Sequence, residues 1–259
     1  MRIITMAGWL LAGTGLAHAA AVVVGGEAPD SAPTAAPPVA ASAPDADTIH
    51  VTDADDAANQ IGLRTAIDMI QQGQPQIAVA MLDKLIPRLD QQHANRRRTV
   101  FCAHTQAEAL FYMGLAGVAR RDAVAVNGDY CDAYFFRGYA NVDLHKPEAA
   151  EADFTKALAL VPNNPHYLSE MGELQSNKRD WDRALGYYER ARDAATAYAP
   201  ENRQLAELTR ALRGIGYVDV ELGKLDEAEA MYRRCLELDP GDEKAQGELG
   251  YVLDLKAKR

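Results

Sequence analysis

Few side chains in this sequence have the types and spacing that catalysis or metal binding requires. The histidines after residue 19 stand at positions 50, 93, 104, 145 and 166, and no two of them form the i, i+4 pair of a helical zinc site. There is no Cys-x-x-Cys pair, no glycine-rich phosphate loop and no serine in a nucleophile-elbow motif. Carboxylates such as Glu148, Glu151 and Asp153 recur at helical spacing, which is typical of a solvated helix face. We therefore expect no catalytic residue, no metal, no cofactor and no enzymatic activity.

The first 19 residues have the composition of a cleavable secretory signal. Arg2 precedes a largely apolar run over residues 3–16, and Ala17-His18-Ala19 places small residues where a signal peptidase reads them. The run is shorter than the about 20 apolar residues of a membrane span. We expect cleavage after about Ala19 and a periplasmic or secreted protein without stable membrane insertion. An uncleaved anchor, lengthened by residues 22–24, is the alternative.

Two regions follow the signal. Residues 20–57 are rich in Ala, Pro, Asp and Ser and lack a periodic apolar pattern, which is typical of a disordered linker. Residues 58–259 suffice for one sizeable domain or an elongated array. The formal net charge of −10 argues against nucleic acid and anionic membranes as partners. The short arginine run at 96–98 does not change this expectation.

An internal repeat of 34 residues organises the second region. Units that begin at residues 131, 165 and 209 share a large apolar residue at position 4, small residues at 8, 20 and 27, and an aromatic residue at 24. The matching residues are Tyr134, Gly138, Ala150, Phe154 and Ala157; then Leu168, Gly172, Ala184, Tyr188 and Ala191; then Leu212, Gly216, Ala228, Tyr232 and Cys235. Pro162 and Pro240 end the second helix of a unit, since proline is not tolerated in a helix interior.

These positions resemble the tetratricopeptide repeat (TPR) family, and the signal indicates an exported bacterial member. The resemblance implies an all-α fold, an antiparallel helix-hairpin solenoid (a TPR superhelix) with about three regular repeats. A degenerate repeat from Asn59, with Gly62 at the large position and Gly73 at its turn, precedes them. A C-terminal capping helix over 243–259 closes the array with a polar end. Glycine at position 8, which costs a helix about 1 kcal/mol, is expected to face the small residue at position 20.

Two segments depart from the repeat. About ten extra residues, 199–208, predict that the first helix of the third unit is elongated, from about 201 to 222. Residues 99–120 predict a long helix, but the ten residues that follow are too few for its second helix. We expect no β-strand in the chain.

Cys102 and Cys131 flank this irregular segment, whereas Cys235 occupies a small buried repeat position and is expected to be a packed thiol. The predicted helix runs about 27 Å beyond Cys102, and residues 121–130 span about 33 Å when extended. Residues 121–130 could therefore run back along the helix and bring Cys131 beside Cys102. An oxidising compartment favours a disulfide, worth about 3–4 kcal/mol by the loop-entropy model. We predict a Cys102–Cys131 disulfide, with two buried thiols as the alternative.

The resemblance also implies a binding surface at positions 2, 5, 9, 12 and 13 of each first helix, where family members receive a peptide or helix. Carried over by register, the partner-binding candidates are Phe135, Tyr139, Glu173, Asn177, Arg210, Arg213, Tyr217 and Tyr251. Aromatic and arginine side chains supply most binding energy in interfaces, and Arg210 with Arg213 could hold a carboxylate. The alternative for Phe135 and Tyr139 is packing against a helix near Phe101 and Phe111. The Lys and Asn carboxylate clamp of some family members is not implied, because Phe135 and Tyr139 occupy its positions.

Together these patterns predict a protein–protein interaction adaptor or scaffold in the periplasm or cell envelope. It would bind a protein or peptide partner on the first-helix surface. The alternative is a structural or self-associating subunit of an envelope assembly, in which the same surface would be an obligate interface.

Overall fold

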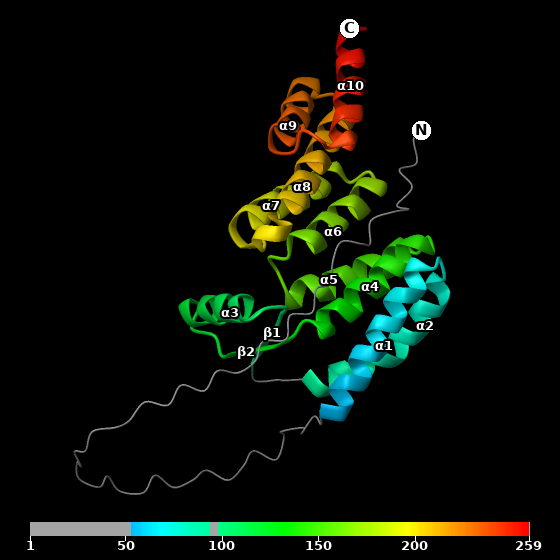
Figure 1. Cartoon of the computed structure of the whole chain (residues 1–259), viewed down its shortest axis with the longest axis vertical. Coiled ribbons are helices and arrows are strands. Elements are labelled where there is room, and N and C mark those ends of the chain that lie inside the picture. The colour runs from blue at the N-terminus through cyan, green and yellow to red at the C-terminus, as the bar shows by residue number, and fades with distance from the viewer. Residues whose placement is uncertain (1–52, 94–97, 259) are drawn as a thin grey trace, which may run out of the picture. The chain divides into compact units, whose positions relative to one another are not determined.

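The computed structural model describes residues 53–93 and 98–258, which form ten α-helices and two β-strands (Figure 1). The elements are α1 (Asp53–Gln71), α2 (Pro75–His93), β1 (Thr99–Ala103), α3 (Gln106–Val118), β2 (Ala123–Asn127), α4 (Asp129–Asp143), α5 (Pro147–Leu160), α6 (Pro165–Asn177), α7 (Trp181–Tyr198), α8 (Glu201–Glu221), α9 (Leu225–Leu238) and α10 (Glu243–Ala257). The predicted signal at 1–19 and most of the predicted linker at 20–57 lie outside the described residues. The first helix begins at Asp53, within the segment predicted as linker.

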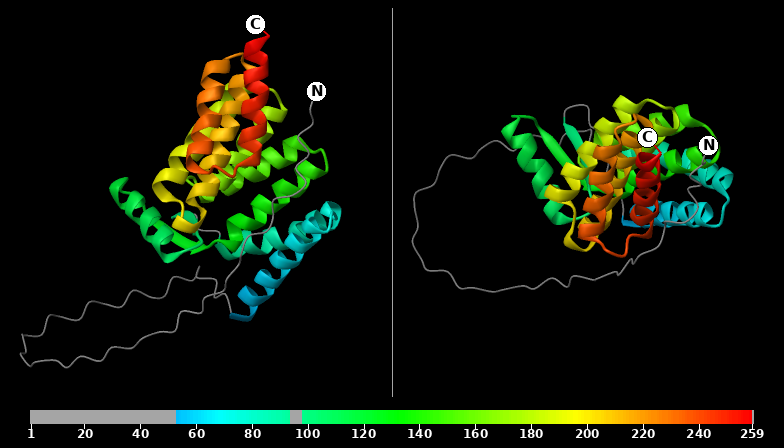
Figure 2. Two further views of the ribbon diagram at one scale, coloured as in Figure 1. Left: turned by 45° about the horizontal axis from the view of Figure 1, so that its top comes forward. Right: turned by 90° about the horizontal axis from the view of Figure 1, so that it is seen from above.

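Four helix hairpins and a closing helix confirm the predicted all-α solenoid. The hairpins are α1–α2, α4–α5, α6–α7 and α8–α9, and each second helix packs against the first helix of the next unit (Figures 1 and 2). Gly73 and Gly223 adopt positive φ angles of 70° and 74° at two of the hairpin turns, where glycine carries no steric cost. The elongated α8 also agrees with the prediction.

The glycines at repeat position 8 lie beneath the aromatic ring at position 24 of the same unit. A Cβ added to Gly138 would stand 2.7 Å from the Phe154 ring, and one at Gly172 or Gly216 would stand 2.9 Å from Tyr188 or Tyr232. The expectation that glycine faces the small residue at position 20 is therefore incomplete. The ring needs the space that a methyl group would fill, which explains why the helix accepts glycine there.

The degenerate first repeat is confirmed and joins the array through α2 and α4. The residues at its positions 8, 20, 24 and 27, counted from Asn59, are all buried: Ala66, Ala78, Leu82 and Leu85. Across the junction, the hydroxyls of Tyr130 and Tyr134 donate hydrogen bonds of 2.8 and 2.7 Å to Asp90.

The predicted long helix at 99–120 is wrong, and so is the expectation of no strand. Residues 99–103 form β1, residues 106–118 form α3, and β2 pairs in parallel with β1 from Thr99–Ala123 to Ala103–Asn127. Val, Thr and Phe in β1 and alternating Val in β2 favour strands. Thr105 caps α3 by accepting a 3.1 Å hydrogen bond from the Glu108 amide. Since α2 packs against α4, the β1–α3–β2 unit is an insertion between two stacked repeats.

Helix α10 caps the array as predicted. Val252 is buried against Leu225, Ala228 and Tyr232 of α9, so the last apolar face of the hairpin is covered. Lys256 adds ion pairs to Asp226 and Glu229. None of the helices among the described residues is long and apolar enough to cross a lipid bilayer.

Candidate functional site

Four of the predicted partner-binding residues lie near one another on the first helices of consecutive repeats. They are Tyr139 of α4, Glu173 of α6, and Arg210 and Tyr217 of α8, and together they are called the first-helix face. Burial and the nearby carboxylates of Glu170, Asp143 and Glu173 raise the pKa of Tyr139 to about 12, whereas Arg210 opposes this shift. Glu173 acts electrostatically on both Tyr139 and Tyr217, and Arg210 acts on Tyr139 and Glu173, although up to 78 positions separate these residues along the chain.

Glu173 is the carboxylate of this face that forms no hydrogen bond or ion pair with any described residue. Burial and the negative charge of Glu170 raise its pKa to about 7, and the positive charges of Arg210 and Lys244 oppose the increase. A half-buried carboxylate without a partner is costly. A cationic group placed beside Glu173 would therefore be stabilised there.

The two arginines are paired within the fold, which corrects the expectation that they hold a partner's carboxylate. Arg210 Nη1 lies 2.7 Å from Glu170 Oε1, and Arg213 forms an ion pair with Asp242. Both carboxylates are buried, with exposed fractions of 4% and 8%. Breaking either pair would leave a buried charge uncompensated, so these arginines support the face and do not offer free positive charge.

Phe135 belongs to the core and not to a binding surface, because only 2% of it is exposed. Its ring stacks on Tyr167 with centroids 4.1 Å apart and lies 5.5 Å from that of Phe154. The neighbours are thus on α5 and α6, and not Phe101 and Phe111 as the packing alternative held. Asn177 and Tyr251 are exposed, and neither forms a hydrogen bond, ion pair or ring contact with a described residue of the first-helix face.

Sequence reasoning missed the buried acids that organise this face. Glu207 Oε2 lies 3.5 Å from His166 Nδ1, and its Oε1 lies 2.9 Å from Arg203. Burial alone would raise the pKa of Glu207, but His166 and Arg203 lower it to about 2. Glu170 and Glu207 occupy no position that the repeat pattern marks. The signals in the sequence were their distances from Arg210: Glu207 stands three residues before it, about one helical turn, and Glu170 stands 40 residues before it.

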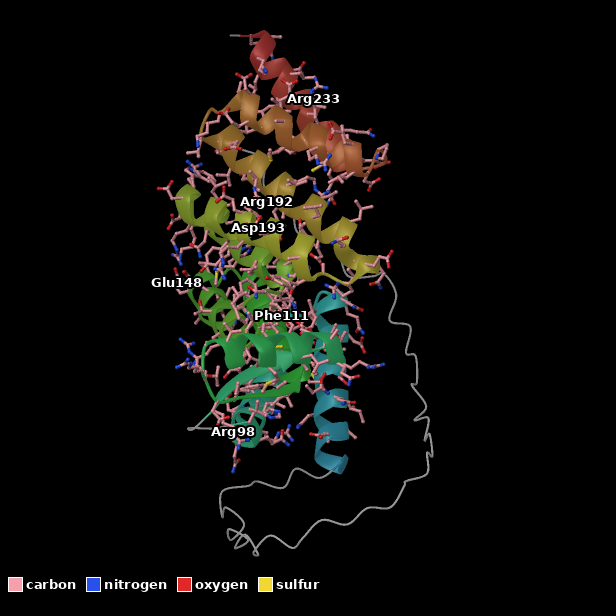
Figure 3. All side chains as sticks on the ribbon, turned by 90° about the vertical axis from the view of Figure 1, so that its left-hand side faces the viewer. Arg98, Phe111, Glu148, Arg192, Asp193 and Arg233 are labelled. Carbon is pink, nitrogen blue, oxygen red and sulfur yellow. The ribbon has the colours of Figure 1, made fainter. Side chains whose placement is uncertain are left out.

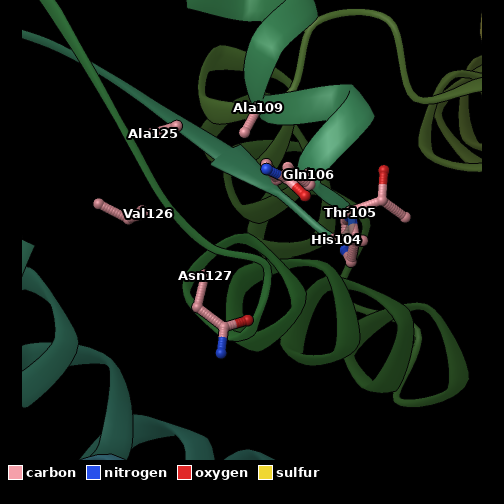
Figure 4. Close-up of a pocket in the computed structure, with 8 residues that line it drawn as sticks. His104, Thr105, Gln106, Ala109, Ala125, Val126 and Asn127 are labelled. Carbon is pink, nitrogen blue, oxygen red and sulfur yellow. The ribbon is translucent and has the colours of Figure 1, made fainter. Parts of the chain in front are cut away.

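A second polar cluster lies where β1 and β2 end and α3 and α4 begin. His104 Nδ1 is 3.2 Å from Glu108 and His104 Nε2 is 3.0 Å from Asp132, which also accepts from the Tyr167 hydroxyl. Burial opposes protonation, but the two carboxylates prevail and raise the pKa of His104 to about 10. Beside it, residues Ala103 to Gln106, Ala109 and Ala125 to Asn127 line a shallow open pocket (Figure 4).

His104, Cys131 and Asp132 offer ligand atoms within 4.8 Å of one another, as a metal site would require. Each is already hydrogen-bonded, since the Cys131 thiol donates to the Gly128 carbonyl over 3.0 Å. We therefore interpret the cluster as a structural link that ties the inserted unit to α4 and α6.

Cys102 and Cys131 lie side by side as buried thiols, and the Cys131 amide donates a 3.1 Å hydrogen bond to Cys102 Sγ. Their predicted proximity is confirmed, although a strand and not the expected helix carries Cys102. The third cysteine, Cys235, is a buried thiol on α9, as expected.

The fold and the first-helix face define an all-α helical-repeat protein of the kind that mediates protein–protein interaction. Tetratricopeptide repeat models match residues 132–164, 168–204 and 210–242. The chain is a tetratricopeptide repeat protein, and members of this family are typically non-catalytic adaptors. No curated protein sequence matches the chain significantly.

Solved structures with the same fold are distant in sequence. A structure of PilF from Pseudomonas aeruginosa is 15% identical with a TM-score of 0.55, covering 78% of this chain and 71% of that one. A MamA structure from Desulfovibrio magneticus RS-1, spanning residue 41 to its end, is 16% identical with a TM-score of 0.51. The match covers 77% of this chain and 85% of that fragment. At these identities the likeness concerns the fold alone.

Proposed function

We propose that this protein is an adaptor or scaffold of the periplasm or cell envelope that binds a segment of a partner polypeptide on its first-helix face. The unpaired carboxylate of Glu173, set between Tyr139 and Tyr217, is the observation that carries the proposal. Aromatic side chains around one charged group are typical of the energetic centre of an interface.

The charges of the face select the chemistry of the partner segment. Arg210 and Arg213 are neutralised by buried carboxylates, so Glu173 is the charged residue of the first-helix face that has no ion-pair partner among the described residues. We therefore expect a segment that carries a Lys or Arg next to apolar side chains. The cation would pair with Glu173, and the apolar groups would pack on the two tyrosine rings.

The secretory-signal pattern supports the periplasmic or envelope location in this proposal. That pattern consists of Arg2, the apolar run at 3–16 and Ala17-His18-Ala19. Cell fractionation and N-terminal sequencing of the mature protein test it. A mature chain that begins near Ala20 in the periplasmic fraction is expected, whereas a cytoplasmic chain that retains Met1 would contradict export.

The binding proposal is tested by the affinity of a segment identified by co-purification from the envelope. Tyr139→Ala and Glu173→Gln should each weaken calorimetric binding by about tenfold or more, as loss of an interface centre does. Glu148→Gln is the matched control, because Glu148 is an exposed acid on α5 that points outward in Figure 3. Equal affinities for Glu173→Gln and Glu148→Gln would reject the first-helix face.

A further inference from the structure

The inserted β1–α3–β2 unit reaches past the hairpin that follows it in the chain and contacts the end of α7. The Phe111 ring of α3 packs on the Tyr198 ring of α7, with centroids 4.4 Å apart and an interplanar angle of 41°. Within the unit, Tyr112 contacts both Phe111 and Phe101 of β1, with ring centroids 5.3 and 5.0 Å apart. A row of four aromatic rings therefore joins β1 to α7. Helix α3 lies on the side of the array that carries α7 (Figures 1 and 2).

Tyr198 can make this contact because α7 departs from the repeat. The second helices of the other two regular units, α5 and α9, are 14 residues long and end before Pro162 and Pro240 at repeat position 32. Helix α7 has Thr196 at this position and runs for 18 residues to Tyr198. Proline ends a helix, whereas the Thr196 hydroxyl donates a 2.9 Å hydrogen bond to the Arg192 carbonyl within the continuing helix. Two departures from the repeat, the inserted unit and the extended end of α7, thus meet in the structure.

The contact crosses the sparsest junction between consecutive hairpins. In a solenoid each repeat packs on its neighbours alone, so the junctions determine how the array bends. Helices α5 and α6 share fewer contacts than α2 and α4 or α7 and α8, and α4 touches α6 less than α6 touches α8. This junction divides the first-helix face, because Tyr139 lies on α4 whereas Glu173 and Tyr217 lie on α6 and α8.

The inserted unit is attached on both sides of this junction. On the α4 side, His104 Nε2 lies 3.0 Å from Asp132 Oδ1. At the turn between α5 and α6, the hydroxyl of the buried Tyr112 accepts a 3.4 Å hydrogen bond from the Asn163 amide. On the α7 side is the ring contact with Tyr198. The attachments therefore follow one another along the array, from the second hairpin to the third.

We propose that the β1–α3–β2 unit is a strap across the junction between the α4–α5 and α6–α7 hairpins, which fixes the spacing of Tyr139 from Glu173 and Tyr217. Separation of the two hairpins would break the aromatic row, so the strap limits bending at the sparsest junction. A binding surface with fixed spacing avoids the cost of ordering when a partner arrives. The effect on partner binding rests on the proposed function of the first-helix face, whereas the effect on the free chain does not.

Distance measurement between two spin labels in the free chain tests the strap. The labels are attached through Asp68→Cys on α1 and Ala230→Cys on α9, at exposed positions on opposite sides of the junction, and the three native cysteines are buried. The labelled wild type should give one narrow distance distribution. Tyr198→Ala should widen it, because the contact across the junction is lost. Ile77→Ala is the matched control on α2, since Ile77 is 48% exposed and Tyr198 is 50% exposed, and it should leave the distribution unchanged.

The matching substitution on α3 tests whether the ring contact itself is responsible. Phe111→Ala should widen the distribution as Tyr198→Ala does. The two substitutions together should have no more effect than either alone, because both remove the same contact. Widening that adds up in the double variant would contradict a shared contact.

Partner affinity then tests whether the strap serves the first-helix face. Tyr198→Ala should weaken calorimetric binding of the partner segment by about two- to tenfold although Tyr198 is not on this face, and Ile77→Ala should not weaken it. An unchanged distance distribution in Tyr198→Ala would overturn the strap, whatever the affinities are. A wider distribution with unchanged affinity would support the strap in the free chain and contradict the first-helix face as the binding site.

Discussion

His104 lies between the carboxylates of Glu108 and Asp132, so its protonation is coupled to folding. In the folded chain its pKa is about 10, against an ordinary value of 6.5. A raised histidine pKa contributes stability that is fully present below 6.5 and is lost as the pH rises toward 10.

We predict that the free energy of unfolding contributed by His104 declines between pH 6.5 and about 10. Urea denaturation across this range measures the slope. His104→Gln keeps hydrogen bonding but cannot carry the charge, so its stability should decline less steeply than that of the wild type. Identical slopes would show that His104 is not held protonated by the two acids.

Gly128, which precedes α4, lies against the His104 ring. A Cβ added to Gly128 would stand 2.7 Å from His104 Nε2, so a side chain at this position would displace the ring. Gly128→Ala should displace the ring, destabilise the protein and return the His104 pKa measured by NMR toward 6.5. Gly186→Ala on α7 is the control, since its Cβ meets nothing within 4 Å. That change should be neutral or stabilise by up to about 1 kcal/mol. A His104 pKa that stays near 10 in Gly128→Ala would contradict this interpretation.

At the scale of elements, the sequence predicts the hairpins well because glycine, alanine and aromatic positions recur in each unit. The inserted β1–α3–β2 unit has no second copy in the chain to compare with. Its strands are five residues each and their apolar residues suit either a strand or a buried helix segment. The N-cap pattern Thr105-x-x-Glu108 indicates in the sequence that the helix begins at Gln106 and not at residue 99.

We predict that Cys102 and Cys131, adjacent in the structure, are joined by a disulfide when the chain is in an oxidising compartment. Thiol counting in denaturant without reductant should find one free thiol per chain, that of Cys235. Reduction should lower the free energy of unfolding by about 3–4 kcal/mol. Three free thiols in protein isolated from the periplasm would contradict the bond.

At the scale of the whole molecule, the register of the repeats predicts which side chains share a face but not which charges neutralise them. Glu173 does act electrostatically on both Tyr139 and Tyr217, and Arg210 on Tyr139. The acids that pair with Arg210 and Arg213 come from other elements, Glu170 of α6 and Asp242 before α10. Such pairing depends on how successive units stack, which a single sequence does not specify.

The pKa of Glu173, about 7, makes partner binding depend on pH. Only the ionised carboxylate attracts a cation, so the affinity for a basic segment should rise as the pH increases through 7. Glu173→Gln should remove this dependence while Glu148→Gln retains it. Affinity that rises equally in both variants would place the titrating group elsewhere.

Photocrosslinking in the native envelope tests most directly whether the first-helix face holds a partner. A photoreactive residue in place of Tyr139 or Tyr217 should crosslink to the same polypeptide, and one in place of Glu148 on α5 should not. A partner captured from position 148 and from neither tyrosine position would contradict binding on the first-helix face.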